Sequence, residues 1–265
     1  MRVAVELVRS SRARACVSAG NTGALAGISH FVLKTLPGVE RAAIIGAIPA
    51  AHGHTLMLDL GANTAATPEQ LLQFAHMGAV ISRDVHGVQA PRIGLLNIGE
   101  EDIKGHAAVR AAHALLSTSP LAYLGFVEGD DIFSGDVDVV VTDGFTGNVA
   151  LKTMEGAAAL IAGRLRREFQ ASWGDRLAGL AARGVLRRVG ASLDPRRYNG
   201  ACMVGLTGLV VKSHGRADRV AFSRAIATAA LAARRGVTSH IAGALTAQGS
   251  SGEPPPAVSA VQRQD

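Results

Sequence analysis

The chain has 265 residues, of which 48% are hydrophobic, so a sizeable core is available and general disorder is excluded. Aromatic residues make up only 4%, which excludes a binder that stacks single-stranded nucleic acid on aromatic platforms. The formal net charge is +6. The two cysteines are too few for a disulfide framework, and the sequence has no apolar run of roughly 20 residues that could span a bilayer. We therefore expect a soluble cytoplasmic protein.

Hydrophobic periodicity predicts alternating helices and strands over the first part of the chain. Helices are expected at 2–9, 22–34, 67–82 and 105–117, and strands at 15–19, 42–48, 55–61, 92–99, 121–127 and 136–144. The helix at 67 begins with Thr67-Pro68-Glu69, which supplies a cap, a proline at the first helical position and an acid in the first turn. The strands are almost continuously apolar, which favours a mostly parallel sheet covered on both faces.

In the second part of the chain we expect a long helix at about 146–169, followed by Arg-rich amphipathic pieces at 170–198. A strand-like stretch at 200–215 and an Ala-rich helix at about 217–246 come after them. The pattern therefore predicts one α/β domain over 1–246 and a disordered tail over 247–265. Nine arginines and three acidic residues fall within 161–197. That segment accounts for the whole net charge, which indicates an acidic partner or an anionic surface.

Four predicted strands run into Gly-rich turns with polar residues, at 18–24, 58–64, 96–105 and 142–148. Ligands of open α/β sheets bind at the carboxyl ends of strands, and helix N-termini there favour anions. We expect the four turns to lie at corresponding ends of one sheet and to bind phosphate or an oxyanion through backbone amides. The alternative is that they are ordinary tight turns in which glycine adopts a positive φ.

Three single residues are candidates for chemistry. Lys104 can neutralise a bound phosphate or form a solvated salt bridge. Asn148 can donate to a developing oxyanion or cap the helix that follows. His214 can act as a base or hydrogen-bond donor, or serve only the turn in which it lies.

Several common site motifs are missing from the sequence. It contains no GxxxxGK[ST], GxGxxG, GxSxG or HExxH pattern, so we assign no nucleotide, hydrolase or zinc-protease site. His52 and His54 have no neighbouring ligand cluster in the sequence, and no metal site is predicted. Cys16 and Cys202 lie in apolar stretches and are expected to be core thiols.

The motifs together resemble the phosphate acyltransferase (acyl-ACP:phosphate acyltransferase, PlsX) family of bacterial phospholipid synthesis. The resemblance covers residues 1 to about 245 and follows the family's order. The matching stretches are ACVSAGNTGAL (15–25), LDLGAN (58–63), PRIGLLNIGEEDIKG (91–105), VTDGFTGNVALKTMEG (141–156), YNGACMVGL (198–206) and VVKSHGRA (210–217).

The resemblance implies a three-layer α/β/α fold similar to isopropylmalate dehydrogenases and phosphotransacetylases. It implies a cytoplasmic homodimer, peripherally associated with the membrane, that transfers a long-chain acyl group from acyl carrier protein to inorganic phosphate. No cofactor is implied, and a membrane glycerol-3-phosphate acyltransferase would use the product. The alternatives are a phosphotransacetylase-like enzyme acting on acyl-CoA, and an inactive remnant that only dimerises or binds membrane.

The site residues follow from the motifs and the implied reaction. Lys104, Asn148 and His214 are expected to be catalytic. Phosphate or substrate binding is expected at Asn21, Thr22, Gly23, Asn63, Thr146 and Gly147. Contact with anionic lipid or acidic carrier protein is expected at Arg166, Arg167, Trp173, Arg187 and Arg188.

The family begins with a further segment that carries the first strands and a DAMGGD-type motif. Met1 of this chain matches an internal position of the family. We therefore expect that the chain is N-terminally shortened and that its sheet and active site lack elements of the full family fold.

Overall fold

A computed structural model describes residues 1–101, 103–192 and 194–250. Residues 251–265 of the tail predicted over 247–265 lie outside the described residues. Within them, the helices are α1 (Arg2–Arg9), α2 (Thr22–Leu33), α3 (Pro68–His86), α4 (Ala107–Ser117), α5 (Gly144–Ala171), α6 (Trp173–Ala181), α7 (Arg183–Ser192), α8 (Arg219–Arg234) and α9 (Val237–Ser250), with 3₁₀ turns η1 (Asp131–Phe133) and η2 (Pro195–Tyr198). The strands are β1 (Ala15–Ser18), β2 (Ala43–Pro49), β3 (His54–Leu58), β4 (Arg92–Leu96), β5 (Ala122–Val127), β6 (Val139–Val141), β7 (Ala201–Val204) and β8 (Leu209–Lys212).

The strands form a single eight-stranded sheet in the order β1-β8-β7-β2-β3-β6-β4-β5. The pairs β1·β8, β3·β6, β4·β6 and β4·β5 are parallel. The pairs β7·β8, β2·β7 and β2·β3 are antiparallel. The sheet is therefore mostly parallel, as predicted, with an antiparallel section in its middle.

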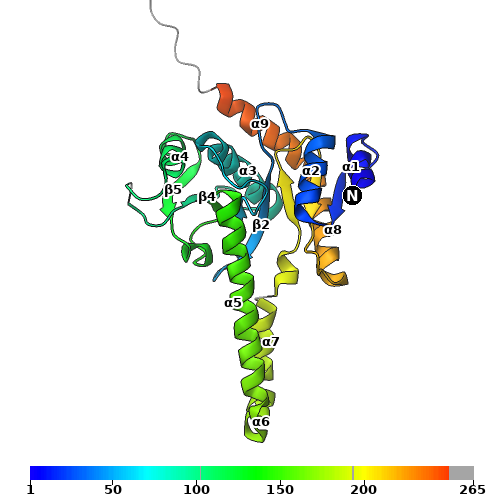
Figure 1. The fold of residues 1–265 in the computed structure, drawn as a ribbon, viewed down its shortest axis with the longest axis vertical. Helices are drawn as coiled ribbons and strands as arrows, with labels where there is room; N and C mark the ends of the chain where they lie inside the picture. The colour runs from blue at the N-terminus through cyan, green and yellow to red at the C-terminus, as the bar shows by residue number, and fades with distance from the viewer. Residues whose placement is uncertain (102, 193, 251–265) are drawn as a thin grey trace, which may run out of the picture.

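Helices cover both faces of the sheet, which confirms the three-layer α/β/α fold (Figure 1). On one face α3, α4, α8 and α9 bury a large apolar cluster. On the other, α1, α2 and the first turns of α5 cover a second cluster. Burial of apolar surface on both faces explains why the strand sequences are almost continuously apolar.

The Ala-rich helix expected at 217–246 is divided into α8 and α9. Gly236 lies between them with φ +66°, a left-handed conformation that glycine adopts without steric cost and that ends a helix. Helix α9 continues to Ser250, so the first four residues of the expected tail are helical.

Helix α5 is longer than expected and extends well beyond the sheet, with α6 and α7 folding back beside it (Figure 1). We call residues 161–192 the Arg-rich hairpin. Gly179 of α6 packs on the ring of Phe169, since a Cβ built at this glycine would lie 3.0 Å from the ring. A side chain at this position would have to displace the ring, so glycine lets α6 pack closely against α5.

The strand directions contradict the expectation that all four Gly-rich turns share one end of the sheet. Three successive antiparallel pairings separate β8 from β3, so β1 and β8 run opposite to β3, β6 and β4. The turns after β3, β4 and β6 therefore lie at one end, which we call end A. The turn at 18–24 lies at the other end, end B, beside the turn after β8.

Candidate functional site

The loop after β3 at end A is built around the carboxylate of Asp59, which is fully buried. Its Oδ1 accepts hydrogen bonds from the backbone N–H groups of Ile44, Gly61 and Ala62 at 2.9, 3.2 and 3.0 Å. Its Oδ2 accepts from the backbone N–H and from Nδ2 of Asn63 at 2.8 and 2.9 Å. Burial raises the pKa of Asp59, and several of these hydrogen bonds lower it.

Asn63, predicted as a binding residue, therefore has both amide hydrogens in use. Besides Asp59, its Nδ2 donates to the carbonyl oxygen of Ala42 at 2.8 Å. The side chain joins the β3 loop to the start of β2 and fixes the loop's conformation. The sequence shows this only as a polar residue in a Gly-rich turn.

Helix α5 begins at end A with its first turn capped by Asp143. The carboxylate accepts from the N–H of Thr146 at 2.8 Å and from its hydroxyl at 2.9 Å. The N–H of Gly147 donates to the carbonyl oxygen of Asp143 at 3.0 Å. The predicted donors of Thr146 and Gly147 are thus bonded to Asp143, whose negative charge already occupies the positive end of the helix dipole.

Two glycines of the TDGFTGN motif are explained by packing against the β3 loop. A Cβ at Gly147 would lie 1.9 Å from the carbonyl oxygen of Asp59, and one at Gly144 would lie 2.4 Å from that of Asn63. Asn148, one turn into α5, lies against Gly61 and is exposed. Among the predicted residues, the structure brings Asn63, Thr146, Gly147 and Asn148 together at end A.

Lys104 lies in the loop after β4, also at end A. Its Nζ pairs with the carboxylate of Glu101 at 3.0 Å, and both side chains are largely exposed. This pairing lowers the pKa of Glu101. The structure therefore shows the salt bridge that was the alternative to a phosphate contact.

His214 lies at end B, in the turn after β8. Its backbone N–H donates to Oδ1 of Asn199 at 2.8 Å, and its Nδ1 accepts from the N–H of Arg216 at 3.1 Å. The neighbouring turn after β1 leads into α2, where Asn21 caps the helix by accepting from the N–H of Ala24 at 3.0 Å. The structure thus brings His214 together with Asn21, Thr22 and Gly23, apart from the end A group.

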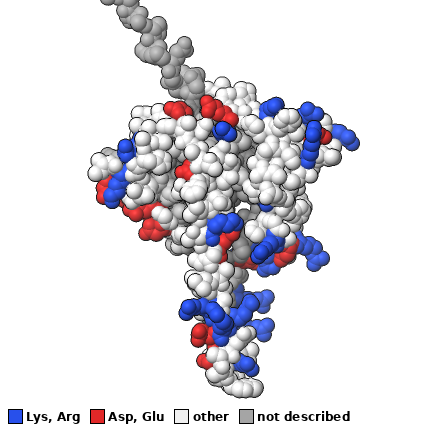
Figure 2. All heavy atoms as spheres, viewed as in Figure 1, with Lys and Arg blue, Asp and Glu red and all other residues white. Residues whose placement is uncertain are grey.

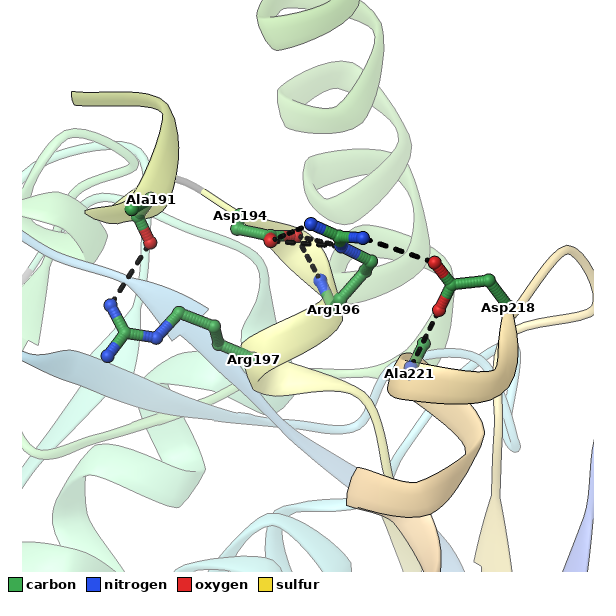
Figure 3. Close-up of polar contacts among 6 residues, drawn as sticks. All are labelled: Ala191, Asp194, Arg196, Arg197, Asp218 and Ala221. Carbon is green, nitrogen blue, oxygen red and sulfur yellow. Dashed lines mark hydrogen bonds and ion pairs between the residues drawn. The ribbon is translucent and has the colours of Figure 1, made fainter. Parts of the chain in front are cut away.

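The Arg-rich hairpin is joined to the domain by a network of ion pairs at η2 (Figure 3). Arg196 pairs with Asp194 at 2.7 Å and with Asp218 at 3.2 Å. Asp218 in turn caps α8 by accepting from the N–H of Ala221 at 2.8 Å, and Arg197 donates to the carbonyl oxygen of Ala191 at 3.0 Å. These contacts fix the end of the hairpin to the start of α8.

The surface of the hairpin is both basic and apolar. Figure 2 shows Lys and Arg side chains gathered along the protruding stem above a white tip. Arg166, Arg167, Arg187 and Arg188 are all exposed on it. Trp173 at the start of α6 is 78% exposed, and Leu177 and Leu180 are each 63% exposed. Within the described residues, no helix has the length and apolar character needed to cross a bilayer.

Neither cysteine is placed to act as a nucleophile. Cys16 and Cys202 are both buried free thiols. Burial raises the pKa of Cys202 to about 12 and raises that of Cys16. Since the thiolate is the reactive form, burial leaves neither thiol activated as a nucleophile.

Comparison with known proteins gives the family. The profile of the family described as "Fatty acid synthesis protein" matches residues 1–240. The chain is 57% identical over 237 residues to the phosphate acyltransferase of Alkalilimnicola ehrlichii, covering 89% of this chain and 69% of that protein. The chain belongs to the phosphate acyltransferase family. It is accordingly an acyltransferase.

A second relative in this family agrees. The phosphate acyltransferase of Alcanivorax borkumensis is 56% identical over 246 residues, covering 92% of this chain and 73% of that protein. The chain therefore corresponds to roughly seven tenths of the length of each of these family members.

Solved structures support the fold. The EutD phosphotransacetylase from Staphylococcus aureus matches 88% of this chain and 67% of its own, with a TM-score of 0.56 and 15% identity. A phosphotransacetylase from Streptococcus pyogenes matches 88% of this chain and 66% of its own, with a TM-score of 0.57 and 17% identity. At such identity the similarity concerns the fold alone.

Proposed function

We propose that this acyltransferase moves a long-chain acyl group from acyl carrier protein to inorganic phosphate, forming acyl phosphate for phospholipid synthesis. The observation that carries the proposal is the 57% identity to a phosphate acyltransferase over 89% of the chain. The family description, a fatty acid synthesis protein, favours a fatty acyl thioester as the donor.

The reaction needs no covalent enzyme intermediate, which agrees with the buried, protonated thiols. An oxygen of hydrogen phosphate attacks the thioester carbonyl, the C–O bond forms and the C–S bond breaks. The proton of hydrogen phosphate ends on the departing thiolate, so atoms and charge balance. Holding the two reactants together can contribute about 7–11 kcal/mol to the lowering of the barrier.

The structure places the predicted residues at both ends of the sheet, whereas the phosphate oxygen and the oxyanion are bonded to one carbon of the tetrahedral intermediate. We assign the orientation of phosphate and the transfer of its proton to His214, with Asn21, Thr22 and Gly23 beside it at end B. Asn148, the predicted donor to the oxyanion, lies with the end A group and is given no step. For Lys104 to bind phosphate, it would have to exchange Glu101 for the substrate.

The Arg-rich hairpin is the proposed contact with an anionic membrane surface, where a membrane glycerol-3-phosphate acyltransferase would take up the product. Exposed Trp173 and leucines on α6, flanked by arginines, are the composition of an interfacial membrane anchor. The acidic acyl carrier protein is the alternative partner for the same arginines. Exposed apolar residues of α5, including Leu160 (60%) and Ile161 (61%), favour the homodimer that the family resemblance implies.

Release of free thiol from purified acyl carrier protein loaded with palmitate tests the donor and acceptor. We expect thiol release that depends on inorganic phosphate, with acyl phosphate as the product. Palmitoyl-CoA serves as the second donor. If only palmitoyl-CoA and not the loaded carrier protein is used as a donor, the proposed donor is wrong and the reaction is phosphotransacetylase-like. If the chain binds the carrier protein but releases thiol from neither donor, it is an inactive remnant.

A further inference from the structure

A cavity of about 170 Å³ lies towards end B, on the face of the sheet that α3 and α8 cover. Its floor includes Ile45 and Ala47 of β2 and Leu56 of β3, and its walls are the C-terminal end of α3, part of α8 and the 3₁₀ turn η2. Ala47 is only half-buried although β2 is an inner strand, so the helices leave this part of the sheet uncovered. An apolar cavity of about 150 Å³ can hold benzene, and the volume here therefore suits a ligand body of about that size.

Polar side chains line the cavity beside this apolar floor. His54, at the start of β3, and His86, at the end of α3, lie with their ring centroids 4.4 Å apart. The ring of Tyr198 lies 6.2 Å from that of His54. Burial lowers the pKa of both histidines, so each imidazole is neutral at pH 7 and has one donor and one acceptor. An apolar surface with a few convergent polar groups is typical of a small-molecule site.

Arg197 of η2 is the charged residue of this lining. Its side chain is exposed, and Nη1 donates to the carbonyl oxygen of Ala191 at 3.0 Å (Figure 3). A guanidinium has five N–H donors in a planar fork that matches a carboxylate, so donors remain for an anion. Among the described residues that line the cavity there is no second Lys or Arg, which favours an anion with a single charge.

The carboxylates nearby are already paired with other arginines. The pKa of Asp194 is lowered first by its hydrogen bond to Arg196, at 2.7 Å, and only further along by the charge of Arg197 (Figure 3). Asp138, beside the start of β3, pairs with Arg92 at 3.0 Å. The described lining itself contains no Asp or Glu. The cavity therefore combines an available guanidinium with an apolar floor.

We propose that this cavity binds a small monocarboxylate whose apolar body is about the size of benzene. The carboxylate pairs with Arg197, and the apolar body lies on the floor formed by β2 and β3. The site is separate from the residues assigned to acyl transfer and goes beyond the proposed function. Asn199 also lines the cavity and accepts a hydrogen bond from the N–H of His214 at 2.8 Å, so a bound ligand lies next to a residue that holds the His214 turn.

Binding of benzoate to the full chain, measured by calorimetry, tests the site, with benzyl alcohol as the neutral ligand of the same size. Benzoate should bind at least about tenfold more tightly, because only the carboxylate makes charge-assisted hydrogen bonds. Arg197→Gln should remove this preference. Arg183→Gln, at an exposed position of α7 outside the lining, should keep it. Absence of benzoate binding to the wild-type chain, or equal benzoate affinity in the two variants, would overturn the proposal.

A substitution on the floor of the cavity locates the apolar body of the ligand. Ala47→Leu places additional side-chain volume in the cavity and should weaken benzoate binding at least about fivefold. Thermal unfolding without ligand shows whether this variant is folded. Wild-type affinity in the folded variant would place benzoate elsewhere and refute the site.

A further measurement uses the unaltered chain and so does not depend on the variants folding. Benzoate should slow hydrogen exchange in segments 195–200 and 213–217 at least about threefold, because the ligand stabilises η2 and, through Asn199, the turn that contains His214. Exchange in α2 should stay unchanged and serves as the control. Equal exchange with and without benzoate in both segments would contradict the proposal, whether or not the chain transfers acyl groups.

Discussion

The side chain of Asn199 holds the backbone of His214 in place. Oδ1 of Asn199 accepts a hydrogen bond from the N–H of His214 at 2.8 Å. Nδ2 donates to the hydroxyl of Ser213 at 2.8 Å and to the carbonyl oxygen of Ala221 at 2.7 Å. One amide thus joins the end of η2, the turn after β8 and the first turn of α8, which gives a role to the YNG motif at 198–200.

Replacing Asn199 by alanine should therefore disturb the His214 turn as well as the fold. We expect the free energy of unfolding to fall by about 1–3 kcal/mol, because buried groups lose their partners. The kcat/KM for phosphate should fall about 10-fold to 100-fold, because His214 is displaced. Urea unfolding and steady-state assays measure the two effects.

The control for Asn199→Ala is Ser223→Ala on α8, the helix that Asn199 contacts, where the hydroxyl makes a local bond to the carbonyl oxygen of Val220 at 2.8 Å. It should change neither quantity appreciably. Wild-type kcat/KM in a folded Asn199→Ala protein would show that Asn199 does not position His214.

The two glycines of α5 at 147 and 156 should respond in opposite ways to alanine. At Gly147 the new Cβ would collide with the backbone of Asp59, 1.9 Å away. Gly147→Ala should therefore destabilise the protein by about 4 kcal/mol or more, or prevent folding. Thermal unfolding and the yield of folded protein measure this.

Gly156 provides the matched comparison within α5. It is exposed, and a Cβ there meets nothing within 4 Å. Gly156→Ala should raise the free energy of unfolding by about 0.5–1 kcal/mol, since alanine is the better helix former. Equal effects of the two substitutions would show that the contact between α5 and the β3 loop is not close.

Much of the fold could be predicted from the sequence because local patterns determine it. Helix α3 begins at Pro68 as the pattern at Thr67 indicates, and the structure adds a capping box between Thr67 and Gln70. Six of the eight strands lie within their expected ranges, and β2 and β3 each extend beyond theirs by one residue. Strand direction could not be predicted, because a strand buried on both faces is apolar throughout whether its neighbours are parallel or antiparallel.

The candidate site was predicted less well, for the same reason. The turns at 18–24 and 142–148 look alike in sequence, since both place glycine and a polar residue before a helix. Their separation depends on three antiparallel pairings in the middle of the sheet.

Reversing the charge of Arg187 and Arg188 tests membrane contact by the Arg-rich hairpin. The wild-type chain should bind vesicles containing phosphatidylglycerol, and added salt should weaken that binding. Arg187→Glu with Arg188→Glu should abolish it, because four units of charge are changed next to the apolar tip. Co-sedimentation with vesicles at several salt concentrations measures the effect.

The control for the hairpin variant carries the same charge change elsewhere. Arg9 and Arg12 are exposed near the end of α1, far along the chain from the hairpin. Arg9→Glu with Arg12→Glu should retain most vesicle binding. Binding that is insensitive to salt and equal in the two double variants would argue against the hairpin as the membrane contact.

His86 should make the protein less stable in acid. It is packed against His54 with 4.4 Å between ring centroids, and burial followed by the charge of His54 lowers the pKa of His86 to about 4. The unfolded chain binds this proton near pH 6.5, whereas the folded chain does not. The free energy of unfolding therefore falls by about 1–3 kcal/mol as the pH is lowered from 6.5 toward 4. Urea unfolding at pH 7, 6 and 5 should show a smaller fall in this free energy for His86→Leu than for wild type. The control His30→Gln, at an exposed position of α2, should show the same dependence on pH as wild type. An identical slope in His86→Leu would exclude His86 as the titrating group.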